Sequence, residues 1–422
     1  MYFCNVLGYC IDTSSTIKGG RVYEVFKLKK DYCGGMKSVL YTSVLQTPIL
    51  LLGSLIILVL GFKELGGWDE MMRVCGAVTV NDYGDTMTNL IRSNDDANFP
   101  WLGALIGSAI IGFWYWCTDQ FIVQRVLSGK NEKEARRGTI FGAYLKLLPV
   151  FLFLIPGMIA FALHQKYIGA GGEGFLPMLA NGTANADAAF PTLVAKLLPA
   201  GVKGLVVCGI LAALMSSLAS LFNSSAMLFT IDFYKRFRPE TPEKKLVGIG
   251  QIATVVIVIL GILWIPIMRS VGDVLYTYLQ DVQSVLAPGI AAAFLLGICW
   301  KRTSAQGGMW GLIAGMIIGL TRLGAKVYYS NAGEVADSTF KYLFYDMNWL
   351  FFCGWMFLFC IIVVIVVSLA TEAPTAEKIQ GLVFGTATKE QKASTRASWN
   401  HWDIIHTVII LAITGAFYWY FW

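Results

Sequence analysis

Charged residues are scarce in this chain of 422 residues: Asp, Glu, Lys and Arg make up 14% of it, while apolar residues make up 56%. Soluble domains usually carry about a quarter of charged residues. The charges lie between long apolar runs, as expected of a chain whose apolar stretches cross hydrocarbon. The shortage therefore favours a membrane protein. The net charge of +6 fits loops that face the inner leaflet, and we predict no nucleic-acid partner.

Residues for metal and covalent chemistry are also few. The sequence has three histidines, none at metal-ligand spacing from another, and nine cysteines without a CxxC pair. Several cysteines lie inside apolar runs and are interpreted as small hydrophobic residues, not as a disulfide framework or a metal site. No nucleotide-binding loop, HExxH motif or nucleophile elbow occurs. We therefore expect a protein that is not an enzyme.

Long apolar runs, in contrast, are frequent. About nine of them have the roughly 20 residues that a helix needs to cross a bilayer. This predicts an all-α, polytopic membrane protein. The predicted spans cover residues 39–62, 101–126, 140–163, 202–229, 247–268, 275–300, 308–323, 348–370 and 401–422.

Lys and Arg are concentrated in alternate connections, which sets the predicted orientation. Basic residues precede the first span and follow the second, fourth and sixth spans, so these segments are predicted to be cytoplasmic. The connections 64–100 and 165–199 carry few basic residues and are predicted to face outside. Residues 1–33 have no long apolar run and no signal-peptide core. We expect a non-spanning cytoplasmic segment there, followed by a transmembrane transporter domain over residues 34–422.

Small residues form one stripe of the span 202–229. Ala213, Ser216, Ser217, Ser220 and Ser224 fall at helical spacing on one face. Such a stripe lets helices pack closely in lipid. Its hydroxyls, together with helix carbonyls, also suit the oxygen shell of Na⁺. The spacing by itself favours close packing over ion binding.

A lysine lies inside the span 140–163. Lys146 is about eight residues, or roughly 12 Å, from the cytoplasmic start of that span, so its side chain snorkels back only in part. It is either a solvated lysine or a donor facing a substrate cavity, and its intramembrane position favours the donor. Asp119, near the inner end of the preceding span, is a natural counter-charge for it.

Polar residues are dense at the start of the span 275–300, where Tyr276, Gln280, Asp281 and Gln283 occur. Such groups are unfavourable in lipid unless they line a cavity. The amide of Gln280 both donates and accepts, as a sugar hydroxyl requires. Pro288-Gly289 predicts a break or kink in the helix. The alternative is a kinked helix whose polar groups are satisfied by its neighbours.

Several longer blocks resemble one known family. They are WYWCTDQFIVQRVLSGKN (114–131), YLKLLP (144–149), ALMSSLASLFNSS (213–225) and AAFLLGICWKR (292–302). In this order they resemble the sodium/glucose cotransporter family, also called sodium:solute symporters. The resemblance extends from about residue 34 to the C-terminus.

The resemblance implies a LeuT-type fold, with two inverted repeats of five helices and extra helices outside them. It also implies Na⁺-coupled symport of a hexose or similar polyol by alternating access across the plasma or inner membrane, with Na⁺ as the co-transported ion. The implied sodium contacts are Ala213, Ser216 and Ser217. The implied substrate contacts are Tyr115, Trp116, Lys146, Tyr276, Gln280 and Gln283.

The sequence departs from the family pattern at several points. Ser43 in Tyr41-Thr42-Ser43 stands where the family has Asp, and Gln283 stands where glucose-type members often carry Thr. The span 39–62 matches the fifth core helix, so we expect an N-terminally incomplete member that holds core helices five to ten and the C-terminal extra helices. A symporter of myo-inositol or a sialic acid, a non-transporting sensor and a decayed gene product remain alternatives.

Overall fold

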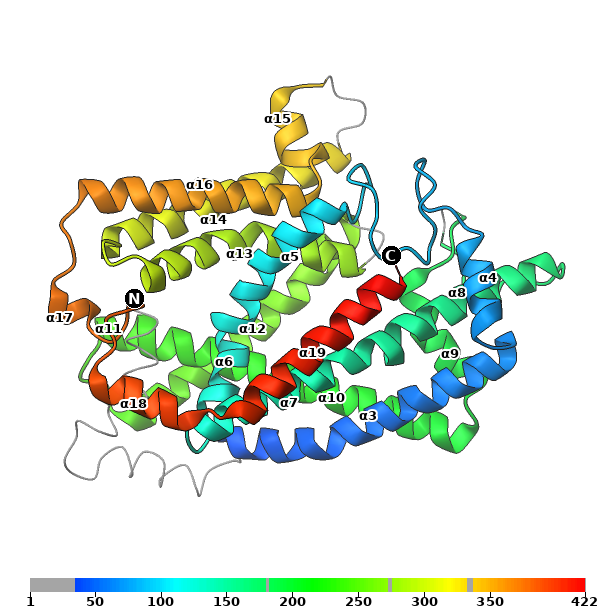
Figure 1. Cartoon of the computed structure of the whole chain (residues 1–422), viewed down its shortest axis with the longest axis horizontal. Coiled ribbons are helices and arrows are strands. Elements are labelled where there is room, and N and C mark those ends of the chain that lie inside the picture. Colours follow the sequence, from blue (N-terminus) through cyan, green and yellow to red (C-terminus); the bar gives the residue numbers. More distant parts are fainter. Residues whose placement is uncertain (1–34, 180–181, 272–274, 332–336, 422) are drawn as a thin grey trace. The chain divides into compact units, whose positions relative to one another are not determined.

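The computed structural model describes residues 35–179, 182–271, 275–331 and 337–421 (Figure 1). Within these ranges the chain is helical, and extended backbone pairs only in isolated β-bridges. The prediction of an all-α protein is therefore confirmed. Residues 1–33, predicted as a cytoplasmic segment, lie outside the described part, and so do the side chains of Tyr41, Thr42 and Ser43.

In the described part, eight helices are long and apolar enough to cross a membrane, or nine if a bent pair counts as one span. This agrees with the predicted number and confirms a polytopic membrane protein. The bent pair is α5 (Trp101–Cys117) and α6 (Gln120–Leu127). The other spans are α3 (Gly35–Leu65), the run of α7 (Glu132–Pro149), η1 (Val150–Leu154) and α8 (Ile155–Gly169), α10 (Ala200–Leu228), α12 (Glu243–Val271), α13 (Leu275–Cys299), α14 (Ala305–Asn331), α16 (Trp349–Ala370) and α19 (His401–Tyr420).

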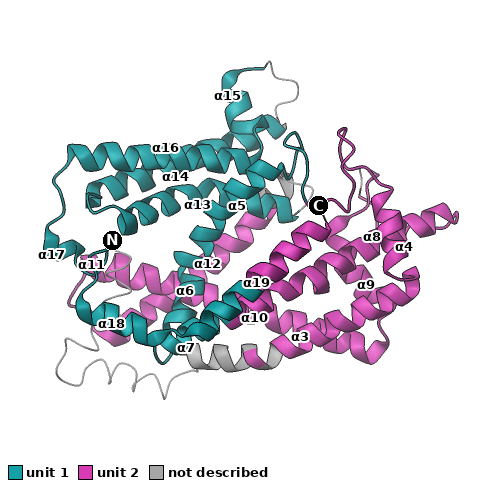
Figure 2. Cartoon of the chain, in the orientation of Figure 1, with its two compact units in different colours: residues 1–26, 91–140, 268–409 teal, residues 27–90, 141–267, 410–422 magenta. Residues whose placement is uncertain are grey.

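The described chain divides into two compact units (Figure 2). Unit 1 is formed by Ile91–Ile140 and Met268–Ile409, and so contains α5, α6, α13, α14 and α16. Unit 2 is formed, within the described residues, by residues 35–90, by Phe141–Ile267 and by residues 410–421. It contains α3, α8, α10 and two shorter helices, α4 (Trp68–Gly76) and α9 (Ala189–Leu197).

Unit 1 is centred on α13, which packs against α5, α14 and α16. Glycines allow the closest approach. A Cβ added to Gly315 of α14 would lie 3.0 Å from the Cα of Gly289 and 3.2 Å from Sγ of Cys360. Such small residues let helix backbones meet in an apolar environment, where the hydrophobic effect does not drive helices together. The buried side chains around this packing include Val285, Ala287, Ala291, Ala292, Leu350, Phe352, Met356 and Cys360.

The predicted cytoplasmic end of the same helices is joined by hydrogen bonds. Nη2 of Arg302, in the turn between α13 and α14, donates to the carbonyls of Thr371 (2.7 Å) and Leu369 (3.4 Å) at the end of α16. The backbone N–H of Ser304 donates to Oγ of Ser368 at 3.1 Å. The two bonds of Arg302 satisfy carbonyls that have no partner within the last turn of a helix, and the bond of Ser304 joins the start of α14 to α16.

Of the break or kink expected at Pro288-Gly289, the break is wrong, and the kink stays a prediction. α13 runs without interruption from Leu275 to Cys299. Proline removes one backbone donor from a helix, yet Pro288 and Gly289 are buried and α14 and α16 pack along this stretch. Packing by neighbouring helices allows proline inside a membrane helix. The packing of α14 and α16 is therefore consistent with an uninterrupted α13.

Unit 2 has its own apolar core, formed where α3, α4, α8, α9 and α10 meet. Gly53 of α3 lies directly against Val206 of α10. At the end of the core, Nδ1 of the buried His164 accepts the backbone N–H of Leu176 at 3.0 Å, which holds the following loop against α8. The buried side chains include Ile57, Leu65, Met71, Cys75, Ile155, Ile159, Leu163, Leu193 and Val206.

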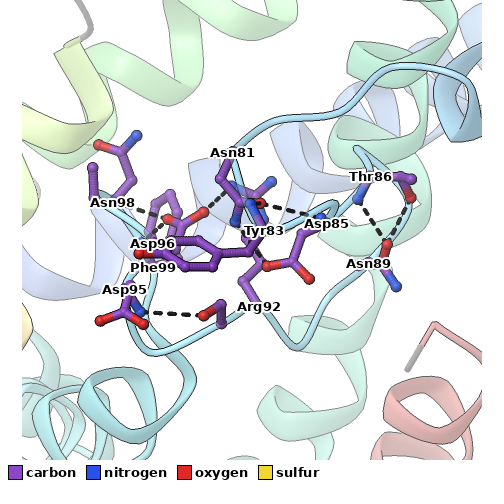
Figure 3. Close-up of polar contacts among 12 residues, drawn as sticks. Asn81, Tyr83, Asp85, Thr86, Asn89, Arg92, Asp95, Asp96, Asn98 and Phe99 are labelled. Atoms are coloured by element: carbon purple, nitrogen blue, oxygen red, sulfur yellow. Dashed lines mark hydrogen bonds and ion pairs between the residues drawn. The ribbon is translucent and has the colours of Figure 1, made fainter.

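Side-chain hydrogen bonds shape the connection between α4 and α5, which is predicted to face outside (Figure 3). In its first half, which belongs to unit 2, Oδ1 of Asn81 accepts the backbone N–H groups of Tyr83 (3.2 Å) and Asp85 (3.1 Å). Nδ2 of Asn81 donates to Oδ2 of Asp85 at 2.7 Å. Asn81 therefore closes a tight turn in the way that Asx residues do.

The second half of this connection belongs to unit 1 and is organised by Asp96. Its Oδ1 accepts the backbone N–H groups of Asn98 (2.9 Å) and Phe99 (2.7 Å), and its Oδ2 pairs with Arg92 at 3.5 Å (Figure 3). The carboxylate is buried, and these three contacts are to residues within four positions of it. The acidic residues of this loop thus stabilise its own turns and the entry into α5.

We predict that Gly315→Ala destabilises unit 1 by about 1–3 kcal/mol, because the added methyl group forces the backbones of α13 and α14 apart. The measurement is the thermal unfolding midpoint of the purified protein in detergent. Gly308→Ala, in the same helix, is the matched control, since its Cβ would meet no atom within 4 Å. Equal midpoints for the two variants would contradict the close approach.

Candidate functional site

Three of the predicted substrate residues share one face of α13. Tyr276, Gln280 and Gln283 are spaced by four and three residues, which places them on one helical stripe. Nε2 of Gln280 donates to Oη of Tyr276 at 2.9 Å. Tyr276 is exposed, and the two amides are half-buried. The structure therefore brings these three side chains together as a polar strip that offers both donors and acceptors.

Asp281, next to Gln280 in sequence, points away from that strip and toward α14. Its Oδ1 lies 3.5 Å from Nη2 of Arg322, and its Oδ2 accepts a hydrogen bond from Nζ of Lys326. One carboxylate thus lies between two cations, all within helices that span the membrane. Charges in such a position are stable only when they are compensated inside the protein.

Arg322 is the most deeply buried of these charged groups, with no exposed surface. Nη2 of Arg322 also donates to the carbonyl of Met347 at 2.8 Å, and Nη1 donates to that of Leu343 at 3.4 Å. The guanidinium carbon lies 4.0 Å from the ring centroid of Phe352, a cation–π distance. Arg322 therefore links α14 to α13, to the segment before α16, and to α16 itself.

Sequence reasoning missed Arg322 and Lys326. The signal was present, because the two cations lie four residues apart in a chain whose apolar spans otherwise carry few charges. The predicted span 308–323 ended before Lys326, whereas α14 continues to Asn331. The rule that intramembrane charges mark functional or structural sites applied to Arg322 inside the predicted span, and it would have selected Lys326 as well if the helix had been extended.

Tyr115 and Trp116 lie in the last turn of α5, immediately before the bend. Their ring centroids are 5.4 Å apart in an edge-to-face arrangement. Tyr115 is half-buried and Trp116 is exposed. The pair belongs to unit 1, as does the strip on α13.

The span predicted over residues 101–126 is bent by 49° between α5 and α6. Asp119 adopts an extended backbone at the bend, and its side chain accepts the N–H of Phe121 at 3.0 Å. Oγ1 of Thr118 donates to the carbonyl of Trp114 at 2.7 Å. Asp119 is therefore the N-cap of α6, a role that the sequence reasoning did not assign to it.

The remaining predicted residues lie in unit 2. Lys146, in the last turn of α7, is exposed and precedes the π-helical segment η1 (Val150–Leu154). Single π-helical turns inside α-helices occur often at functional sites. That Lys146, Tyr115 and Gln280 surround one cavity stays a prediction.

The small-residue stripe of α10 has two distinct halves. Ser220 and Ser224 are buried, and Oγ of Ser224 donates to the carbonyl of Ser220 at 2.8 Å. This half behaves as close packing predicts. Ala213 is half-buried and Ser217 is exposed, so this half of the stripe leaves room for a further contact. The side chain of Ser216 lies outside the described residues.

The described helices define a polytopic membrane protein, and several of its spans carry polar side chains. Comparison with known proteins identifies the family. The family model "Sodium:solute symporter family" matches residues 31–315. The chain belongs to this family. The resemblance seen in the sequence blocks is thereby confirmed, and so is a multi-pass protein of the cell membrane.

Similar relatives carry the names of sodium-coupled sugar transporters. The chain is 35% identical over 409 residues to the sodium/mannose cotransporter SLC5A10 of Bos taurus, covering 92% of this chain and 68% of that protein. It is 35% identical over 364 residues to human sodium/myo-inositol cotransporter 2, covering 84% of this chain and 54% of that protein. It is 37% identical over 355 residues to sodium/glucose cotransporter 1 of Ovis aries, covering 80% of this chain and 54% of that protein. The chain thus spans about half to two thirds of the length of these relatives.

We predict that Asp119→Ala lowers stability by about 1 kcal/mol, the usual effect of losing an N-cap, whereas Asp119→Asn retains most of it because the amide oxygen still accepts from Phe121. The thermal unfolding midpoint in detergent checks both variants. Equal losses for Asn and Ala would mean that the charge of Asp119 matters, as it would for a counter-charge to Lys146.

Proposed function

We propose that this chain carries out Na⁺-driven symport of a hexose or a similar polyol by alternating access, as part or all of a membrane transporter. Membership of the sodium:solute symporter family carries the proposal, and the relatives named above pair sodium with mannose, myo-inositol or glucose. No covalent step is involved, because transport changes only the side of the membrane on which the solute lies. The lipid bilayer is the structural partner.

The polar strip of α13 supports a hydroxyl-rich substrate. Two amides and a phenol at helical spacing offer alternating donors and acceptors, and the Gln280–Tyr276 hydrogen bond can open toward a ligand. In the proposed site Gln280 and Gln283 contact the sugar, and Tyr276 closes its outer side. Tyr115, with Trp116 beside it, closes the inner side, since aromatic rings pack against the C–H face of a sugar.

Lys146 distinguishes substrate classes in this proposal. Beside a neutral sugar its ammonium group donates hydrogen bonds to hydroxyls, while beside a sialic acid it pairs with the carboxylate. A sodium/myo-inositol cotransporter among the relatives makes a cyclic polyol the second candidate substrate. Uptake competition between sugars, myo-inositol and sialic acid separates the three.

The half of the α10 stripe that contains the half-buried Ala213 and the exposed Ser217 supports the proposed cation site. Na⁺ binds several oxygen atoms without needing a fixed charge. We assign the hydroxyls of Ser216 and Ser217 and the carbonyl of Ala213 to this shell. In the family arrangement the spans from α3 to α13 correspond to core helices five to ten, and α10 corresponds to the eighth.

We predict that the protein, expressed in cells from the complete coding sequence that contains this chain, takes up a labelled hexose only when Na⁺ is present outside. Replacing Na⁺ with choline should abolish uptake, because the ion gradient supplies the driving force. A second variant, Gln280→Ala, tests the sugar contact: it is expected to raise the half-saturating sugar concentration by about tenfold through loss of one or two hydrogen bonds. Ligand binding without Na⁺-dependent uptake would favour a non-transporting sensor.

We predict that Ser217→Ala raises the Na⁺ concentration for half-maximal uptake by about five- to tenfold, because one oxygen ligand is lost. Reciprocal coupling then lowers the apparent sugar affinity by the same linked free energy. Ser220→Ala is the matched control, since Ser220 is buried in helix packing. Loss of sugar binding with unchanged Na⁺ dependence would remove Ser217 from the cation site.

A further inference from the structure

The two faces of α13 carry different kinds of polar residue. Tyr276, Gln280 and Gln283 lie within one narrow sector, and Asp281 lies roughly 130° around the helix from them, at 3.6 residues per turn. Val285, on the side of Asp281, is buried against Gly319 of α14. One face of α13 thus presents amides, and the opposite side packs against α14 through an ionic contact.

The packed side of α13 meets α14 mainly through small residues. Gly315 and Gly319 of α14 allow close approach, and Val285 of α13 fills the gap at Gly319. This apolar contact resists large rotations of α13, and a directional polar interaction adds to the definition of its register. Buried polar groups are known to set the register of packed helices.

The charged cluster supplies that directional interaction. The carboxylate of Asp281 is held by Arg322 and Lys326 at the same time. Arg322 itself is fixed by the carbonyl of Met347 and by the ring of Phe352, so it is an anchor that cannot follow a rotating partner. Rotation of α13 would separate a buried carboxylate from both cations, which a low-dielectric environment strongly disfavours.

We propose that Asp281, clamped by Arg322 and Lys326, is the positioning residue that sets the rotational register of α13 and thereby aims Gln280 and Gln283 at the substrate. In this proposal Asp281 does not touch the substrate, because its carboxylate faces α14: Oδ2 accepts a hydrogen bond from Lys326, and Oδ1 lies 3.5 Å from Nη2 of Arg322. The cluster acts through the neighbouring amides. The inference rests on the proposed function for the identity of the substrate, and on the contacts within unit 1 for the positioning.

The test compares Asp281→Asn, Gln280→Ala and the double variant in uptake assays with the labelled hexose, with surface expression measured for each. Asp281→Asn keeps the shape of the side chain and removes its charge. We expect about a tenfold increase in half-saturating sugar concentration, while the maximal rate per transporter changes by less than about threefold. In the double variant the combined effect should be smaller than the product of the two, because part of the effect of Asp281 is exerted through Gln280 and only the part exerted through Gln283 remains.

The matched control is Lys341→Met, which breaks the Asp337–Lys341 ion pair in the same unit. Asp337 is exposed, and surface pairs contribute little, so transport should not change. If Asp281→Asn does not reach the membrane, Asp281→Glu replaces it: the carboxylate is kept but displaced by one methylene, and a smaller, equally non-multiplicative effect is expected.

Effects of Asp281→Asn and Gln280→Ala that multiply, or an Asp281→Asn variant with unchanged sugar affinity, would overturn the positioning role. A parent protein without Na⁺-driven sugar uptake would contradict the proposed function instead, and it would do so before any variant is compared. The two failures are therefore distinguishable.

Discussion

The absence of water from hydrocarbon is the constraint on which unit 1 depends. A charged side chain there must find its partners within the protein. Arg322 meets this requirement with a carboxylate, two backbone carbonyls and an aromatic face, drawn from α13, the segment before α16, and α16. One guanidinium group thus joins α14 to α13 and to α16, and the glycines of α13 and α14 allow the close approach of the same two helices.

Much of the fold could be predicted because hydrophobicity over about 20 residues is a property of sequence alone. The spans and their number followed from it. The ends of helices did not, because they depend on single polar residues: Asp119 divides α5 from α6 by capping, which a hydropathy pattern does not detect. At Pro288 the sequence suggested a helix break that the structure does not have. The effect of a proline on a helix depends on neighbours that are distant in sequence.

The candidate site was predictable where one helix carries it. Tyr276, Gln280 and Gln283 stand out because they are polar and spaced by helical turns, and Gln280 is hydrogen-bonded to Tyr276. Their contact with a substrate stays a prediction. Arg322 and Lys326 did not stand out, because their importance comes from Asp281, some 40 residues earlier on another helix. The stripe on α10 shows the same limit. Its spacing indicates a shared face, but only the structure separates the buried Ser220 and Ser224 from the exposed Ser217.

The hydrogen bonds of Arg302 at one end of α16 and those of Arg322 near its other end have a mechanical consequence. The turn that leads into α14 is bonded to the C-terminal end of α16, and α14 itself is bonded to the segment just before α16, so tilting or sliding of α16 against α14 strains bonds at both ends. α13 is joined to the same pair through Asp281. A pulling force applied to the C-terminal side of α16 is therefore shared by all three helices, and they should leave the membrane in a single step.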